Sequence, residues 1–93
     1  MGTFFMFGKY TLDSIRQVSA RRSDQAVALI QQAGGTFKSG YALLGEHDLV
    51  LIAEFPGPEQ AMKASVGLTR LLGISFTTAP AVSMEAFDKL VGA

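Results

Sequence analysis

The chain has 93 residues, and its eight Lys or Arg and eight Asp or Glu side chains give a formal net charge of zero at pH 7. This length suits one domain, which we expect to span residues 1–93. The absence of cysteine excludes disulfides, thiolate metal sites and cysteine nucleophiles. Only 17% of the residues are charged, against roughly 25% in a typical soluble domain. We therefore expect a compact domain that covers some of its apolar surface with a partner.

The N-terminal stretch from Met1 to Phe7 is apolar, but Gly8 and Lys9 end it far short of a membrane span, which needs about 20 apolar residues. No basic region precedes it and no small-residue cleavage site follows it. We expect a soluble cytoplasmic protein that does not associate with a membrane.

Residues 3–10 are rich in aromatic side chains, which favours a strand. Because side chains alternate along a strand, Phe5 and Phe7 point to one face and Phe4 and Met6 to the other. Both faces of this strand are therefore apolar.

Residues 11–34 predict an interrupted helix, with Thr11 as its N-cap and with Gly34 and Gly35 ending it. We expect its core-facing stripe to begin with Leu12, Ile15 and Val18. We expect Ser23 to cap a second segment whose inward residues are Ala26, Leu29, Ile30 and Ala33.

Within the stretch Tyr41–Phe55, two apolar runs flank Gly45-Glu46-His47-Asp48, which is typical of a hairpin. We expect the two strands of this hairpin over residues 36–44 and 48–55. The second run is apolar on both faces. Its alternation sets Leu49, Leu51, Ala53 and Phe55 on one face and Val50, Ile52 and Glu54 on the other.

The break at Pro56-Gly57-Pro58 precedes a predicted helix over 58–72, which Gly73 ends. A fourth strand follows over 74–79, which we expect Pro80 to stop. Ser83 is then the expected cap of a short helix that runs to about Val91. The order β-α-β-β-α-β with a terminal helix predicts an α+β, ferredoxin-like fold, with a four-stranded antiparallel sheet and both main helices on one face.

Helices on one side leave the other face of the sheet open, and in a monomer an open face is polar. Leaving five large apolar side chains exposed there would forgo about 1.5–3 kcal/mol each, or roughly 8–15 kcal/mol together. That sum rivals the whole stability of a small domain. We expect the open face to be buried against a second copy of the chain, in a homodimer or higher homo-oligomer.

His47 is the only histidine and lies in the hairpin beside Asp48. One interpretation makes His47 a general base with a neighbouring carboxylate, or makes the pair metal ligands. The other is structural, with Gly45 supplying a positive φ and Asp48 accepting hydrogen bonds from backbone N–H groups of the turn. Adjacent strand residues point to opposite faces, which disfavours a dyad, and we expect no metal site.

Further candidates lie along the chain. Glu54 is either an acid in a cavity or the partner of Lys9, Lys38 or an arginine in an ion pair. Tyr10 and Tyr41 either line a pocket on the open side or pack at an interface.

Arg16, Arg21 and Arg22 form a basic cluster, which either receives an anion or is a solvated helix face. Gly34-Gly35 lacks the spacing of a phosphate loop, and we expect no cofactor. RNA-recognition domains share the βαββαβ order, but they carry basic and aromatic residues on the third strand. The run 49–53 has neither, and we expect no nucleic-acid partner.

Several stretches together resemble the GYD-domain family over nearly the whole chain: Gly8-Lys9-Tyr10-Thr11, Gly34-Gly35, Tyr41 to Val50 and Glu54-Phe55-Pro56. The hairpin is the most specific of these, although His47 stands where the Gly-Tyr-Asp signature has tyrosine and Glu46 follows Gly45. The resemblance implies a chain of the dimeric α/β-barrel group, in which ferredoxin-like subunits pair sheet to sheet. That group includes small cofactor-free monooxygenases, isomerases and stress-response proteins, some with a cavity between sheet and helices. It implies no particular activity for the GYD family itself.

Two functions follow as expectations. The first is a cytoplasmic homo-oligomeric domain that binds a small ligand, with Tyr41 and Arg16 as candidate contacts. The second is a cofactor-independent enzyme, an oxygenase or isomerase, that uses His47, Glu54 or Tyr10 in a cavity. A closed apolar pocket with His47 or Glu54 pointing into it would favour the enzyme.

Overall fold

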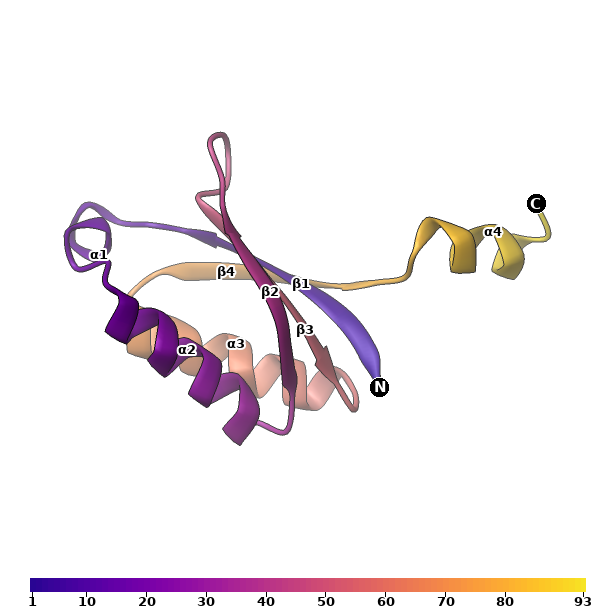
Figure 1. Cartoon of the computed structure of the whole chain (residues 1–93), viewed down its shortest axis with the longest axis horizontal. Coiled ribbons are helices and arrows are strands. Elements are labelled where there is room, and N and C mark those ends of the chain that lie inside the picture. Colours follow the sequence, from indigo (N-terminus) through magenta and orange to yellow (C-terminus); the bar gives the residue numbers. More distant parts are fainter.

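The computed structural model describes residues 1–93, which form a single sheet with helices on one face (Figure 1). In chain order the elements are β1 (Gly2–Lys9), α1 (Leu12–Arg16), α2 (Ala20–Gln32), β2 (Thr36–Ala42), β3 (Leu49–Phe55), α3 (Pro58–Leu72), β4 (Ser75–Ala81) and α4 (Met84–Val91). The strands are antiparallel and lie in the order β2-β3-β1-β4. The predicted α+β, ferredoxin-like fold is confirmed.

Strand β1 lies at the centre of the sheet, between β3 and β4. Its Met6 is paired with Leu51 of β3 and with Thr78 of β4. Phe4 and Met6 are buried under the helices, whereas Phe5 and Phe7 lie on the other face and are half-buried. The predicted alternation of β1 is therefore confirmed.

The core fills the space between the sheet and helices α2 and α3. Small residues on the inner side of α3 let that helix lie close to the strands, and the rings of Phe4 and Phe55 meet edge to face with centroids 5.7 Å apart. The fully buried large side chains come from both layers and are Met6, Ile30, Phe55, Leu68 and Ile74. The predicted inward positions of α2 are confirmed as well: Ala26, Ile30 and the C-cap Ala33 are buried, and Leu29 packs against the core.

The predicted interruption of the first helix is confirmed, but the predicted cap is wrong. The second segment begins at Ala20, and Ser19 rather than Ser23 is its N-cap, because the Ser19 hydroxyl accepts a hydrogen bond from the Arg22 N–H at 3.2 Å. Ser23 lies one turn into α2, where its hydroxyl donates to the Ser19 carbonyl.

The core stripe predicted for the first helical segment is also wrong. Leu12, Ile15 and Val18 are 78%, 47% and 56% exposed. The buried residue of α1 is Ser14, which forms a capping box with Thr11: each hydroxyl accepts from the other residue's backbone N–H, at 3.0 and 2.7 Å. That polar pairing turns Ser14 inward, and the apolar residues of this short helix face outward.

Strand β4 runs through Pro80 to Ala81, two residues beyond its predicted end. It is an edge strand that pairs only with β1, and a proline at a free edge removes no ladder hydrogen bond. The hairpin strands are shorter than predicted, because β2 ends at Ala42 and β3 begins at Leu49.

Helix α4 projects beyond the end of the sheet, away from α1 (Figure 1). Ser83 caps it as predicted, but none of its residues is buried. The helices of this chain lack the combined length and hydropathy that crossing a membrane requires.

Candidate functional site

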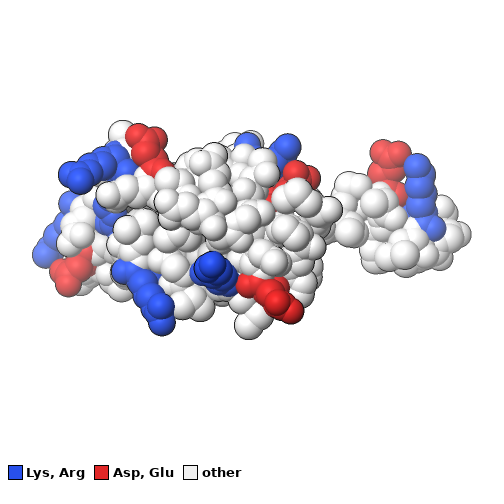
Figure 2. Space-filling model, turned by 90° about the horizontal axis from the view of Figure 1, so that it is seen from below, with Lys and Arg blue, Asp and Glu red and all other residues white.

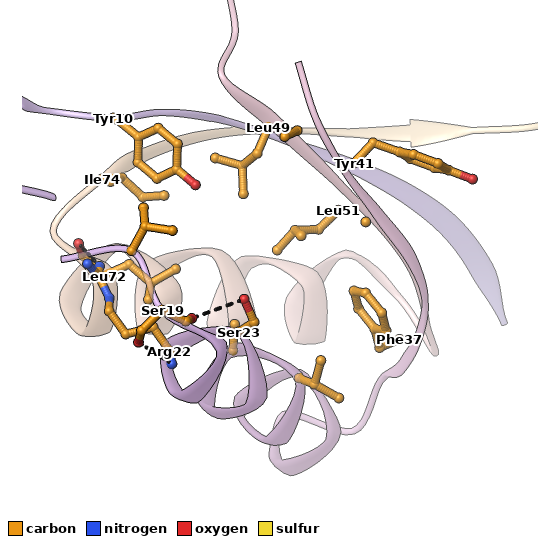
Figure 3. A pocket seen from close by; sticks show the side chains of 15 residues that line it. Tyr10, Ser19, Arg22, Ser23, Phe37, Tyr41, Leu49, Leu51, Leu72 and Ile74 are labelled. Atoms are coloured by element: carbon orange, nitrogen blue, oxygen red, sulfur yellow. Dashed lines mark hydrogen bonds between the residues drawn. The ribbon is translucent and has the colours of Figure 1, made fainter. Parts of the chain in front are cut away.

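An apolar cleft of about 460 Å³ lies between the helix-covered face of the sheet and α2, and it is open to solvent on one side (Figure 3). Eleven of its 15 lining residues are hydrophobic. Pockets that bind small molecules are mostly apolar and occupy roughly 300–1,000 Å³. The cleft therefore has the size and the lining of a small-molecule site.

The cleft exists because β2 and α2 place small residues where they face each other. Gly40 and Ala42 of β2 point to the helix side, opposite Leu51 and Leu49 of β3, and Ala26 faces them from α2. Larger side chains at these positions would fill the space. Phe37 lines one end of the cleft, and Leu72 and Ile74 line the other (Figure 3).

Tyr10 supplies a polar group at the cleft. Its side chain comes from the segment after β1 and points its hydroxyl toward the hollow, with Leu49 beside it (Figure 3). Its backbone is fixed, because the Tyr10 N–H donates to Asp48 Oδ2 at 2.7 Å. Ser19 and Ser23 add hydroxyls at the N-terminal end of α2.

Arg22 is the one charged side chain that lines the cleft. Its guanidinium donates through Nη1 to the Ser14 carbonyl at 3.1 Å and through Nη2 to the Leu72 carbonyl. These two acceptors lie in α1 and at the last turn of α3. Arg22 therefore clamps the two helices to α2, and its contacts are with protein carbonyls.

His47 lies on the open side of the sheet, away from the cleft. Its ring packs on Phe7, with centroids 5.0 Å apart, and Phe7 in turn lies against Phe5 at 6.2 Å. His47 and Asp48 do not act as a pair in this geometry, because Asp48 is bonded to Tyr10. His47 covers the edge of an aromatic row on the open face.

Glu54 lies on the same open face, paired in register with Thr3 and Thr36. Its Oε1 is 3.9 Å from the Lys38 Nζ, and both side chains are partly exposed. Of the two predicted environments, this is the ion pair and not the cavity.

The other two ligand candidates also stand apart from the hollow. Tyr41 borders the cleft, but its ring points away from it (Figure 3) and is 60% exposed. Arg16 is exposed on α1 and does not line the cleft. Basic side chains gather near that end of the molecule, opposite α4, in the view of Figure 2.

Gly45 has a φ of 155° with open space around it, so the predicted positive φ is confirmed. The hydrogen bond predicted for Asp48 goes elsewhere than expected: the carboxylate accepts from Tyr10 N–H, just after β1, and not from the N–H groups of its own turn.

Sequence reasoning missed Phe37, Arg22 and the small residues of β2 as parts of one site. The available signal was the fall in side-chain size at Gly40 and Ala42, opposite two leucines of the neighbouring strand. Nowhere do three or more His, Asp or Glu side chains gather closely enough to hold a metal ion.

The model of the GYD domain family matches residues 4–91 of the chain. A comparison with curated proteins gives no match.

Proposed function

The chain belongs to the GYD-domain family, and within that family we propose a binding role for it: a homodimer whose cleft holds one small, neutral, mostly apolar molecule per chain. The cleft between sheet and α2 is the observation that carries this proposal. Its eleven hydrophobic lining residues favour an apolar body. The Tyr10 hydroxyl favours a ligand with one hydrogen-bonding group.

The ligand is neutral because the cleft offers no free charge. Its only charged side chain, Arg22, already bonds two backbone carbonyls. A charged ligand would leave water without a partner of opposite sign, which is costly. Binding is favoured over catalysis because His47 and Glu54, the strongest candidates for acid–base chemistry, lie on the opposite face of the sheet.

The open face supports the homodimer. Its apolar centre consists of Phe5, Phe7 and Ile52, which are half-buried, around Val50, which is 7% exposed. Neighbours within the sheet already cover part of these side chains, so a partner would add less than the 8–15 kcal/mol expected from full exposure. Phe5 pairs in register with Ile52, and Phe7 with Val50, so the apolar side chains of β1 and β3 lie next to one another. A second copy with the same face would be self-complementary there.

A fluorescent probe tests the binding role directly. 2-Naphthol is neutral, apolar and carries one hydroxyl, and the protein has no tryptophan to obscure its emission. We expect saturable binding with one probe per chain, together with methyl chemical-shift changes at Leu49, Leu51, Leu72 and Ile74. Shifts confined to Val50 and Ile52, or no saturation, would overturn the assignment of the cleft.

Two tyrosines provide a matched pair of variants. Tyr10→Phe removes the hydroxyl that points into the cleft and should weaken 2-naphthol binding about 2–10-fold, the equivalent of one hydrogen bond. Tyr41→Phe makes the same change on a ring that points away and should leave the Kd unaltered. Equal effects from both variants would contradict the proposed orientation of the ligand.

A further inference from the structure

Helix α4 is amphipathic, yet its own chain buries none of its residues. Its large apolar side chains recur at three- and four-residue spacing, so they lie on one side of the helix. Their exposed fractions are high: Met84 76%, Phe87 47%, Leu90 78% and Val91 57%. The opposite side carries Glu85 and Lys89, whose charged atoms are 3.4 Å apart.

A helix of this length does not persist alone. α4 has eight residues, whereas isolated helices shorter than about 12–15 residues are marginal in water. The Ser83 cap and the single Glu85–Lys89 pair contribute only about 1 kcal/mol and 0.2–0.5 kcal/mol. The apolar side of α4 therefore needs a surface to cover it.

An anionic membrane is a poor candidate for that surface. α4 carries Glu85 and Asp88 against a single Lys89, so its net charge is negative. Interfacial helices instead carry Lys and Arg on their polar side, which anionic lipids attract.

A second copy of this chain is the better candidate. β4 belongs to the sheet whose open face is proposed to pair, and α4 follows it after only Val82 and Ser83. Strand alternation gives that face about 15 side chains, whereas a standard interface uses roughly 20–30 residues a side. Adding the eight residues of α4 brings the surface to that size.

We propose that the C-terminal arm, residues 82–91, crosses to the partner protomer and packs the apolar side of α4 beside the partner's open sheet face. The inference rests on the homodimer of the proposed function. It adds that the dimer is held by reciprocal exchange of these arms. The projection of α4 beyond its own sheet is the geometry that lets it reach a neighbour (Figure 1).

Intermolecular spin-label broadening tests the exchange, and the absence of native cysteine allows one clean label site. Lys89→Cys places a nitroxide on the polar side of α4, where it does not disturb the apolar contact. The nitroxide-carrying variant, prepared without ¹⁵N, is mixed with ¹⁵N-labelled wild type, and the mixture is left until the subunits have exchanged. We expect broadening of amides in the strands of the ¹⁵N-labelled partner.

A second, apolar-side variant separates contact from mere proximity. Leu90→Asp in the nitroxide chain should abolish the broadening and weaken the dimer at least tenfold. Asp88→Asn, on the polar side, should change neither. Broadening that survives Leu90→Asp would overturn the docking of the apolar side.

The remaining outcomes separate the two proposals. A dimer without intermolecular broadening would overturn the arm exchange and leave the open-face dimer standing. Broadening found only when nitroxide and ¹⁵N share one chain would mean that α4 folds back on its own body, which also overturns the exchange. A monomer at every concentration would overturn both proposals.

Discussion

Asp48 and Tyr10 are 38 residues apart in the chain, yet the Asp48 carboxylate accepts a hydrogen bond from the Tyr10 N–H at 2.7 Å. The backbone of Asp48 strengthens the junction, because its N–H donates to the Gly8 carbonyl and its carbonyl accepts from Leu43, each at 2.8 Å. One residue thus joins the end of β1 to both sides of the hairpin. This junction sets the position from which the Tyr10 ring enters the cleft.

Removing the carboxylate should therefore weaken both the fold and the site. Asp48→Ala leaves the partly buried Tyr10 N–H without its acceptor, and we expect the free energy of unfolding to fall by about 1.5–3 kcal/mol. Urea denaturation measures this loss. Asp48→Asn retains an acceptor oxygen and should lose distinctly less, so equal losses in the two variants would count against the hydrogen bond.

Arg22 should behave as a structural clamp. Arg22→Ala removes the two bonds to the Ser14 and Leu72 carbonyls. A bond from a charged donor contributes about 1.5–3 kcal/mol, but Arg22 is only partly buried, so we expect the two together to contribute about 2 kcal/mol to the unfolding free energy. Arg21→Ala changes an exposed neighbour with no such bond and should stay within about 0.5 kcal/mol of wild type. If thermal unfolding shows the same loss of stability for both variants, the bonds of Arg22 to the two carbonyls do not stabilise the fold.

Gly35 is required by close packing. A Cβ there would lie 2.6 Å from Phe55 Cδ1 and 2.9 Å from the Glu54 carbonyl oxygen, and neither a buried ring nor a strand backbone yields easily. We expect Gly35→Ala to destabilise the protein by about 1–3 kcal/mol, as overpacking does. At Gly2 the nearest atom, Phe4 Cε1, is 3.6 Å away, and Gly2→Ala should be close to neutral. Chemical denaturation of the two variants measures both losses of stability. Equal losses would point to a general effect of replacing glycine and not to close packing at Gly35.

The open face should respond to a change of polarity at Ile52. Ile52→Thr keeps a β-branched side chain in the strand but removes about 1.5 kcal/mol of apolar burial, so we expect roughly tenfold weaker dimerisation by sedimentation equilibrium. Val66→Thr makes a comparable change on the exposed side of α3, and we expect it to leave the dissociation constant of the dimer at its wild-type value. Unchanged association of the Ile52 variant would place the interface elsewhere.

The sheet and its faces were predictable because strand alternation is a strong local pattern. Alternation alone places Phe4 and Met6 on one face of β1 and Phe5 and Phe7 on the other. The bounds of α3 follow from residue type, because Pro58 begins the helix and Gly73 ends it in a left-handed conformation. The family match over residues 4–91 likewise confirms the resemblance carried by the hairpin.

The errors arose where a specific polar contact overrode the pattern of side-chain spacing, once from a neighbouring residue and once from a residue distant in sequence. The spacing of Leu12, Ile15 and Val18 suits a core stripe, but the Thr11–Ser14 capping box turns the other side of α1 inward. The hairpin position of Asp48 predicts an acceptor for N–H groups of its own turn, but the segment after β1 supplies the Tyr10 N–H instead.

The cleft was beyond sequence reasoning for a related cause. Its walls come from β2, β3, α2 and the end of α3, and only the register of Gly40 and Ala42 against Leu51 and Leu49 reveals the missing volume. His47, the most conspicuous residue in the sequence, proves to pack on Phe7 on the opposite face.

Native mass spectrometry in the presence of 2-naphthol tests the central claim most directly, because one spectrum reports both subunit number and bound molecules. The account predicts a complex of twice the 9.9 kDa chain mass that takes up two probe molecules, one per cleft. A single chain that takes up none under the same conditions would contradict it.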